Sequence, residues 1–297
     1  MTSTPSAPFG RLATAMITPF TQSGSVDHET AWRLARHLSD HGNDALVVAG
    51  TTGESPTLSD DEKIALFATV VESVKEKDTL VVAGTGTYDT RHSVELTRRA
   101  AEVGADGVLA VTPYYNKPSQ AGQIAHFSEI ADVGLPVMVY NIPGRTGSKT
   151  EVETLVTLAS HPNIAAVKDA VLDVEFTSAT INRAPSLPVY SGQDTFTLPM
   201  LAVGAVGVVS VVGHLAPLAI KSMIDAAYEG DWAEARRLHH DLLPLCEACF
   251  LESNPAPVKA AMNAFWEPVG DVRLPLVAPS DETLGAIEKA LGALQGL

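Results

Sequence analysis

The stretch IAAVKDAV, residues 164 to 171, is a short run of small and β-branched apolar residues in which a lysine follows the apolar positions. Apolar runs of this length that alternate with helical segments predict strands of a parallel sheet covered on both faces. Seven further runs of this kind, each bounded by Gly, Pro or polar residues, occur along the chain: ATAMITPF (13–20), DALVVAG (44–50), TLVVAGTG (79–86), GVLAVTPYY (107–115), LPVMVYNIP (135–143), LPVYSGQD (187–194) and VGVVSVVG (206–213).

The segments between these runs predict helices. One of them begins with SDDE, in which Ser59 and Glu62 have the spacing of a capping box. Eight β/α units within about 220 residues predict a (β/α)8 TIM barrel, which is an α/β fold. Helical patterns continue after the eighth run, so we expect a barrel domain at residues 1–228 and a C-terminal helical extension at residues 229–297.

The alternative architecture is a doubly wound open sheet that binds a dinucleotide. Its fingerprint requires three glycines at fixed spacing after a strand, and GTGTYDT at residues 84–90 lacks the third of them. The sequence also has no G-K-[S/T] phosphate-binding loop. The barrel is therefore favoured.

The charge of the chain argues against several classes of partner. With 35 acidic and 20 basic residues the net charge is −15, so we expect neither nucleic acid nor an anionic membrane surface as a partner. The nearly uncharged segment 199–220 is divided by Pro and Gly residues, and it predicts a short helix and a buried strand rather than a membrane span. Residues 1–10 lack the pattern of a secretory signal, which favours a cytoplasmic protein.

Two cysteines, Cys246 and Cys249, form a lone C-x-x-C pair in a segment rich in Leu and Ala. Without a second pair or matching His spacing this is a weak signal for a metal, and a helical segment is the wrong context for a thioredoxin-like motif. We therefore predict no metal and no cofactor.

The carboxyl ends of barrel strands carry the active site in folds of this kind. These positions place several polar side chains on one rim: Thr51, Thr52 and Glu54 after the second strand, Tyr114 and Tyr115 after the fourth, Tyr140 and Arg145 at the fifth, and Lys168 at the sixth. The loops after the seventh and eighth strands offer Gly192 and Gly213 but no basic residue, so a phosphorylated substrate is not expected.

Three of these side chains have both a chemical and an ordinary explanation. Lys168 is either a strand-end lysine that reaches water or a desolvated amine that acts as a nucleophile. Tyr140 is either a rim aromatic or a phenol close to that amine. Arg145, in NIPGRTG, is either a solvated loop residue or a clamp for a carboxylate.

Two loops are open to the same double interpretation. GTTGES, residues 50–55, can direct backbone N–H groups and two hydroxyls toward a carboxylate, but glycine turns also occur for geometric reasons alone. Tyr114 and Tyr115 could serve packing or an interface. Taken together, an amine, a phenol, hydroxyls and an arginine favour imine-forming carbon–carbon bond chemistry on a 2-oxo acid.

At these residues the chain resembles the dihydrodipicolinate synthase and N-acetylneuraminate lyase family. The similar stretches cover nearly the whole chain: TPF (18–20), GTTGES (50–55), VTPYYNKPSQ (111–120), YNIPGRTG (140–147), VKDA (167–170), SGQD (191–194), GVVSV (207–211), NPAPVK (254–259) and RLP (273–275).

The resemblance implies a (β/α)8 barrel with a C-terminal helical region, assembled as a homotetramer. It implies that Lys168 forms an imine with pyruvate and that Tyr140, Thr51 and Tyr115 relay protons, with Tyr115 coming from a neighbouring subunit. Thr52, Gly192 and Val209 would line the pyruvate site, and Arg145 would hold the carboxylate of aspartate 4-semialdehyde. The implied product is 4-hydroxytetrahydrodipicolinate, on the route to lysine and diaminopimelate.

Within the family, the arginine of PGRTG and the threonine at position 51 resemble the synthase branch, because sialic acid lyases lack this arginine and have Ser in place of Thr51. Two departures are DAVLD after Lys168 and SGQD where SGDD is commoner. Another pyruvate-dependent class I aldolase, acting on a sugar acid, is the alternative enzyme, and a ligand-binding relative without activity is a second alternative.

Feedback inhibition by lysine is expected to be weak or absent. In lysine-inhibited relatives the effector pocket includes an asparagine, a glutamate and a histidine that correspond to Tyr88, His92 and Lys63. Replacing the carboxylate by His92 removes a partner for an ammonium group, and Lys63 adds a like charge. Asp60 could supply a substitute carboxylate.

Overall fold

Eight parallel strands close into a barrel in chain order, with β1 paired to both β2 and β8. The structure is a computed structural model that describes residues 6–295. Each strand is one of the eight predicted apolar runs: β1 (Leu12–Ala15), β2 (Ala45–Val48), β3 (Leu80–Gly84), β4 (Gly107–Val111), β5 (Val137–Asn141), β6 (Ile164–Asp169), β7 (Val189–Ser191) and β8 (Gly207–Ser210). The predicted TIM barrel is therefore confirmed.

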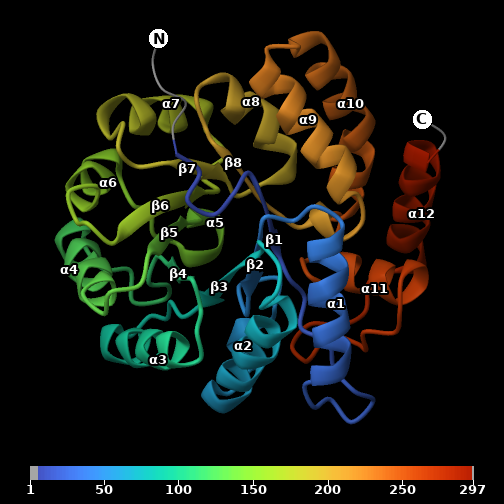
Figure 1. Ribbon diagram of the computed structural model, residues 1–297, viewed down its shortest axis with the longest axis horizontal. Coiled ribbons are helices and arrows are strands. Elements are labelled where there is room, and N and C mark those ends of the chain that lie inside the picture. Colours follow the sequence, from blue (N-terminus) through green and yellow to red (C-terminus); the bar gives the residue numbers. More distant parts are fainter. Residues whose placement is uncertain (1–5, 296–297) are drawn as a thin grey trace.

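Helices surround the barrel and continue beyond it (Figure 1). The helices that follow strands β1 to β8 are α1 (His28–Asp40), α2 (Asp60–Val74), α3 (Thr90–Glu102), α4 (Gln120–Ala131), α5 (Pro143–Thr146), α6 (Val152–Leu158), α7 (Val174–Arg183), α8 (Thr197–Ala202) and α9 (Pro217–Glu229). The C-terminal helices are α10 (Trp232–Ala248), α11 (Ala256–Phe265) and α12 (Asp281–Gln295). Three short 3-10 turns, η1 (Ser55–Thr57), η2 (Asp194–Phe196) and η3 (Val212–His214), lie in the loops.

The strands present alternate residues to two different cores. Leu46 and Val48 of β2 belong to the core between the sheet and the helices, whereas Ala45 and Val47 belong to the core inside the barrel. On β6, Ala166 belongs to the inner core. Because side chains on a strand repeat every second residue, Lys168 faces the barrel interior as well.

Helix α2 begins at the capping residue that the sequence predicts. Ser59 and Glu62 form the capping box of α2 in both directions. Helices α3 and α4 have simpler N-caps: the Asp89 side chain accepts from the backbone N–H groups of Arg91 and His92, and the Ser119 side chain accepts from that of Gly122. The segment 199–220 is divided into the end of α8, the strand β8, the turn η3 and the start of α9, as predicted. Within residues 6–295, no helix is long and apolar enough to cross a membrane.

The C-terminal helices pack onto one side of the barrel, and Figure 1 shows α10 beside α9 and α11 beside α1. Helix α10 packs against α9 and α12, and these helices share one apolar cluster with Leu12 of β1 and Val208 of β8. The division predicted between residues 228 and 229 lies at the C-terminal end of α9, which ends at Glu229. The barrel and the C-terminal helices share this apolar cluster, and their division into two domains stays a prediction.

Candidate active site

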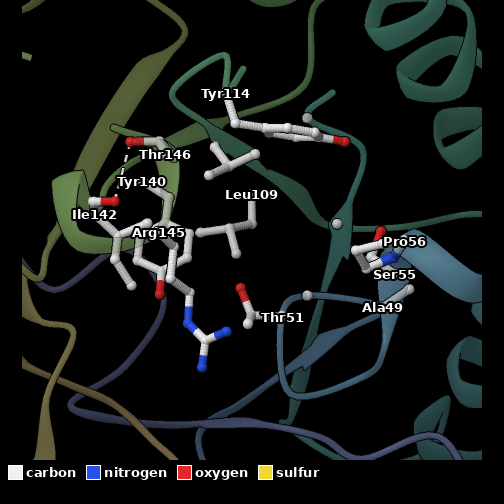
Figure 2. Close-up of a pocket in the computed structure, with 14 residues that line it drawn as sticks. Ala49, Thr51, Ser55, Pro56, Leu109, Tyr114, Tyr140, Ile142, Arg145 and Thr146 are labelled. Atoms are coloured by element: carbon white, nitrogen blue, oxygen red, sulfur yellow. Dashed lines mark hydrogen bonds between the residues drawn. The ribbon is translucent and has the colours of Figure 1, made fainter. Parts of the chain in front are cut away.

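A cavity of about 220 Å³ opens at the carboxyl ends of strands β2 to β5. Figure 2 shows the Thr51 hydroxyl, the Arg145 guanidinium and the Tyr140 ring directed into this space. The lining residues are Ala49, Gly50, Thr51, Ser55, Pro56, Gly84, Gly86, Leu109, Val111, Tyr114, Tyr140, Ile142, Arg145 and Thr146. The structure therefore brings together three of the predicted site residues and Tyr114.

Lys168 lies at the end of β6, next to this cavity, with its Nζ atom 4.2 Å from the centre of the Tyr140 ring. Strand pairing places Tyr140 of β5 and Tyr190 of β7 on either side of it. Only 5% of the residue is exposed. Burial lowers the pKa of Lys168 to about 7; the Asp194 carboxylate opposes the shift and the Arg145 charge adds to it. The lysine is therefore a buried amine rather than a strand-end residue in water.

Tyr140 is buried, and burial raises the pKa of its phenol to about 12. The Arg145 charge and the nearby Thr51 hydroxyl oppose this rise. At neutral pH the phenol is therefore protonated and can donate a proton.

Arg145 lies on α5, the short helix that follows β5. Pro143 occupies the first turn of this helix, where a missing N–H costs nothing. The Thr146 hydroxyl donates to the Ile142 carbonyl at 3.0 Å and stabilises the turn. One guanidinium nitrogen donates to the backbone carbonyl of Asn254 at 3.3 Å, which leaves other N–H groups of Arg145 for a ligand in the cavity.

The turn after β2 carries Thr51, Thr52 and Glu54. Thr52 is buried, and its Oγ1 accepts a hydrogen bond from Asn254 Nδ2 at 2.9 Å. The backbone N–H groups of Thr52 and Gly53 have no acceptor among the residues that the structure describes. A turn with free N–H groups beside a hydroxyl is suited to binding a carboxylate.

Glu54 anchors this turn. Its backbone is left-handed, with φ 56°, which is strained for a residue other than glycine. Its carboxylate pairs with Lys259 Nζ at 2.7 Å, and both side chains are 1% exposed. The second carboxylate oxygen accepts the Arg273 backbone N–H at 2.8 Å. Because both oxygens of the Glu54 carboxylate have a partner, this buried ion pair holds the turn in place.

Of the other predicted pyruvate-site residues, Val209 lies inside the barrel and Gly192 directly follows β7, and neither lines the cavity of Figure 2. Gly192 packs so tightly that an added Cβ would lie 2.8 Å from the Ala170 Cβ, so only glycine fits there. Val209 of β8 is buried in the inner core with Tyr140. Asp194 is buried close to Gly192, where it accepts hydrogen bonds from Ser210 and Val211. Burial raises the pKa of Asp194.

Tyr115 lies outside the cavity of its own chain. It is 92% exposed and has a left-handed backbone with φ 68°. The neighbouring Tyr114 lines the cavity and packs edge-to-face against Tyr88. A strained backbone together with an exposed aromatic side chain is unusual for a residue that makes contacts only within its own chain.

Cys246 lies in the last turn of α10 and Cys249 is the residue that caps its C-terminal end, in the helical context that the sequence predicts, and both thiols are free and buried. Burial raises the pKa of both thiols. Across the described part of the chain, no group of three or more His, Cys, Asp or Glu side chains has the arrangement of a metal site.

The model of the dihydrodipicolinate synthetase family matches residues 8–294. The chain belongs to this family. A relative from Heliobacterium modesticaldum, named 4-hydroxy-tetrahydrodipicolinate synthase, is 50% identical over 285 residues, which is 95% of each chain. A second relative, from Streptomyces coelicolor and named 4-hydroxy-tetrahydrodipicolinate synthase 2, is 50% identical over 297 residues, which is 99% of each chain.

Solved structures of family members have the same fold. A dihydrodipicolinate synthase from Cyanidioschyzon merolae, solved with lysine bound, is 42% identical and superposes with a TM-score of 0.95 over 98% of this chain and 100% of that one. The dihydrodipicolinate synthase from Bacillus anthracis is 44% identical, with a TM-score of 0.92 over 96% of this chain and 98% of that one.

Sequence analysis assigned no role to Asn254, Lys259 or Asp194. Asn254 and Lys259 belong to NPAPVK, a stretch that contributed to the family resemblance, so the signal was present without a role attached to it. Their partners are 202 and 205 residues away in the sequence, and only the folded chain brings them together.

The pKa of Lys168 predicts a pH dependence for the reaction of its amine. Burial lowers this pKa to about 7, so the neutral fraction of the amine rises about tenfold between pH 6 and pH 8 and then levels off. We expect the rate at which pyruvate and cyanoborohydride label Lys168 to follow this curve. Labelling that keeps rising beyond pH 9 would show that the amine has an ordinary pKa.

Proposed function

We propose that this protein condenses pyruvate with aspartate 4-semialdehyde to 4-hydroxytetrahydrodipicolinate, as the names of its relatives state for those proteins. The observation that carries the proposal is the buried amine of Lys168, whose pKa is about 7, beside a cavity lined by Tyr140, Thr51 and Arg145. A lysine of this kind is a nucleophile at neutral pH.

Imine formation is the first chemical step. The lone pair of the Lys168 amine attacks C2 of pyruvate, and a C–N bond forms while the carbonyl oxygen takes up a proton. Loss of this oxygen as water leaves the imine. Tyr140 is protonated at neutral pH, so its phenol can supply a proton to the departing oxygen and Thr51 can pass protons onward.

Carbon–carbon bond formation follows. Loss of a proton from C3 of the bound pyruvate gives an enamine, and C3 then attacks the aldehyde carbon of the second substrate. Arg145 at the exposed mouth of the cavity holds the carboxylate of that substrate. Attack of the substrate's own amino group on C2 closes the ring and releases Lys168 as a free amine.

Mass spectrometry of the protein after treatment with pyruvate and borohydride tests this function. We expect one reduced pyruvyl group on Lys168, because only an amine forms an imine that hydride can reduce. Turnover should require aspartate 4-semialdehyde, and sugar aldehydes should be poor substrates. A labelled Lys168 with preferred use of a sugar aldehyde would indicate another class I aldolase. An unlabelled Lys168 in active enzyme would contradict the mechanism itself.

We further propose that the protein is a homotetramer in which Tyr115 of a neighbouring subunit completes each site. The strained, exposed position of Tyr115 outside its own cavity supports this proposal. Its contribution from a second chain makes the site composite.

Subunit complementation tests the shared site. Lys168→Ala and Tyr115→Phe should each be nearly inactive alone. Subunits of the two variants refolded together should recover roughly a quarter of the wild-type kcat, because half of the pairs are mixed and one of their two sites is intact. A mixture as inactive as its components would show that each Tyr115 acts in its own chain or not at all.

Lysine should inhibit the protein weakly or not at all. The Asp60 carboxylate is engaged by His92 Nε2 at 2.9 Å, so it is not free to bind an ammonium group. Lys63 is buried nearby, and burial lowers its pKa. We expect initial rates to change by less than about twofold across millimolar lysine. A variant with Tyr88→Asn, His92→Glu and Lys63→His should gain sensitivity, whereas saturable inhibition of the unmodified protein would contradict the prediction.

A further inference from the structure

We propose that Asn254, in the C-terminal region, is a positioning residue that makes the Thr52 hydroxyl a hydrogen-bond donor to the carboxylate of pyruvate. The inference rests on the proposed function, because it assigns the turn after β2 to that carboxylate. Asn254 precedes α11 and lies against the turn from outside the barrel, 202 residues away in the sequence.

The direction of one hydrogen bond carries the inference. Asn254 Nδ2 donates to Thr52 Oγ1 at 2.9 Å, so the acceptor side of this hydroxyl is occupied. Within residues 6–295 the Thr52 hydroxyl proton has no acceptor. A hydroxyl that already accepts from an amide directs its proton elsewhere, and a substrate carboxylate offers only acceptors.

The side-chain amide of Asn254 is oriented with its NH2 group toward the Thr52 hydroxyl. In the structure Nδ2 donates one N–H to Thr52, and Oδ1 has no partner in the described part of the chain. The reverse orientation would bury an NH2 group that makes no hydrogen bond at all, in a residue that is 94% buried. Asn254 therefore donates to Thr52, not the reverse.

The turn itself does not depend on this hydrogen bond. The ion pair of Glu54 with Lys259 and the N–H of Arg273 hold its far end, and the Thr18 hydroxyl donates to the Gly53 carbonyl at 2.6 Å. Loss of the Asn254 side chain should therefore free the Thr52 hydroxyl without collapsing the turn.

Asn254 also contacts the group assigned to the second substrate, but through its backbone. Its carbonyl oxygen accepts from the Arg145 guanidinium, and a side-chain substitution keeps that oxygen. Asn254→Ala should therefore alter the use of pyruvate and leave the KM for aspartate 4-semialdehyde nearly unchanged.

The test compares Asn254→Ala with Asn254→Asp in borohydride trapping of Lys168 at increasing pyruvate concentrations. Alanine leaves the hydroxyl unaligned, and we expect the half-saturating pyruvate concentration to rise about threefold to tenfold. Aspartate is nearly isosteric but accepts the Thr52 proton and adds a negative charge, so it should raise this concentration at least about tenfold further. Arg33→Met, which breaks the half-exposed contact of α1 with Glu267 in the C-terminal region, should match the wild type.

A purely structural role predicts the opposite order. Aspartate would keep the packing and a hydrogen bond to Thr52, so it would resemble the wild type while alanine was impaired, and this order would overturn the inference. The same half-saturating pyruvate concentration in the wild type and in both Asn254 variants would also overturn the inference. If wild-type Lys168 is not trapped at all, the proposed function fails instead.

A second set of variants keeps the inference testable if Asn254→Asp does not fold. Thr52→Val removes the hydroxyl and should raise the half-saturating pyruvate concentration at least as much as Asn254→Ala. Because Asn254 acts through this hydroxyl, Asn254→Ala should add less than about twofold in the Thr52→Val background. Independent, multiplicative effects would contradict the inference.

Discussion

The chemistry of this protein depends on the burial of one amine. Lys168 shares the inner face of β6 with Ala166, and the closed barrel around it removes water from its ammonium form. A pKa lowered from 10.5 to about 7 corresponds to a penalty on the order of 5 kcal/mol for the protonated form in the folded state. The unfolded chain holds this proton between pH 7 and 10.5, so the contribution of Lys168 to stability improves as pH rises through that window.

The C-terminal region contributes to the site because its residues hold the turn after β2, which carries Thr51 and Thr52. Glu54 adopts a strained backbone and keeps it because Lys259 and Arg273 satisfy both carboxylate oxygens. Burial lowers the pKa of Lys259 to about 8, while Glu54 opposes that shift. Removing the side chain of Glu54 or of Lys259 would leave the charge of the other buried and unpaired, which is far more costly than losing the contact alone. Rigidity at the turn thus comes in part from residues that lie outside the barrel.

Local signals in the sequence predict most of the fold. The eight apolar runs became the eight strands, and the Ser59–Glu62 spacing became the capping box of α2. The same signals predict that Lys168, Tyr140, Arg145 and Thr51 meet at one rim, because each follows or ends a strand. The contacts of Asn254 and Lys259 could not be predicted in this way, since they join segments about 200 residues apart through side chains alone. The role proposed for Tyr115 requires a second chain, which the contacts within one chain do not report.

A crystal structure of the protein soaked in pyruvate tests the central claim most directly. The account predicts continuous electron density from Lys168 Nζ to C2 of pyruvate, with the carboxylate of pyruvate on the turn that carries Thr52. Pyruvate bound in the barrel at full occupancy with no covalent link to Lys168, or with its carboxylate away from that turn, would contradict the account.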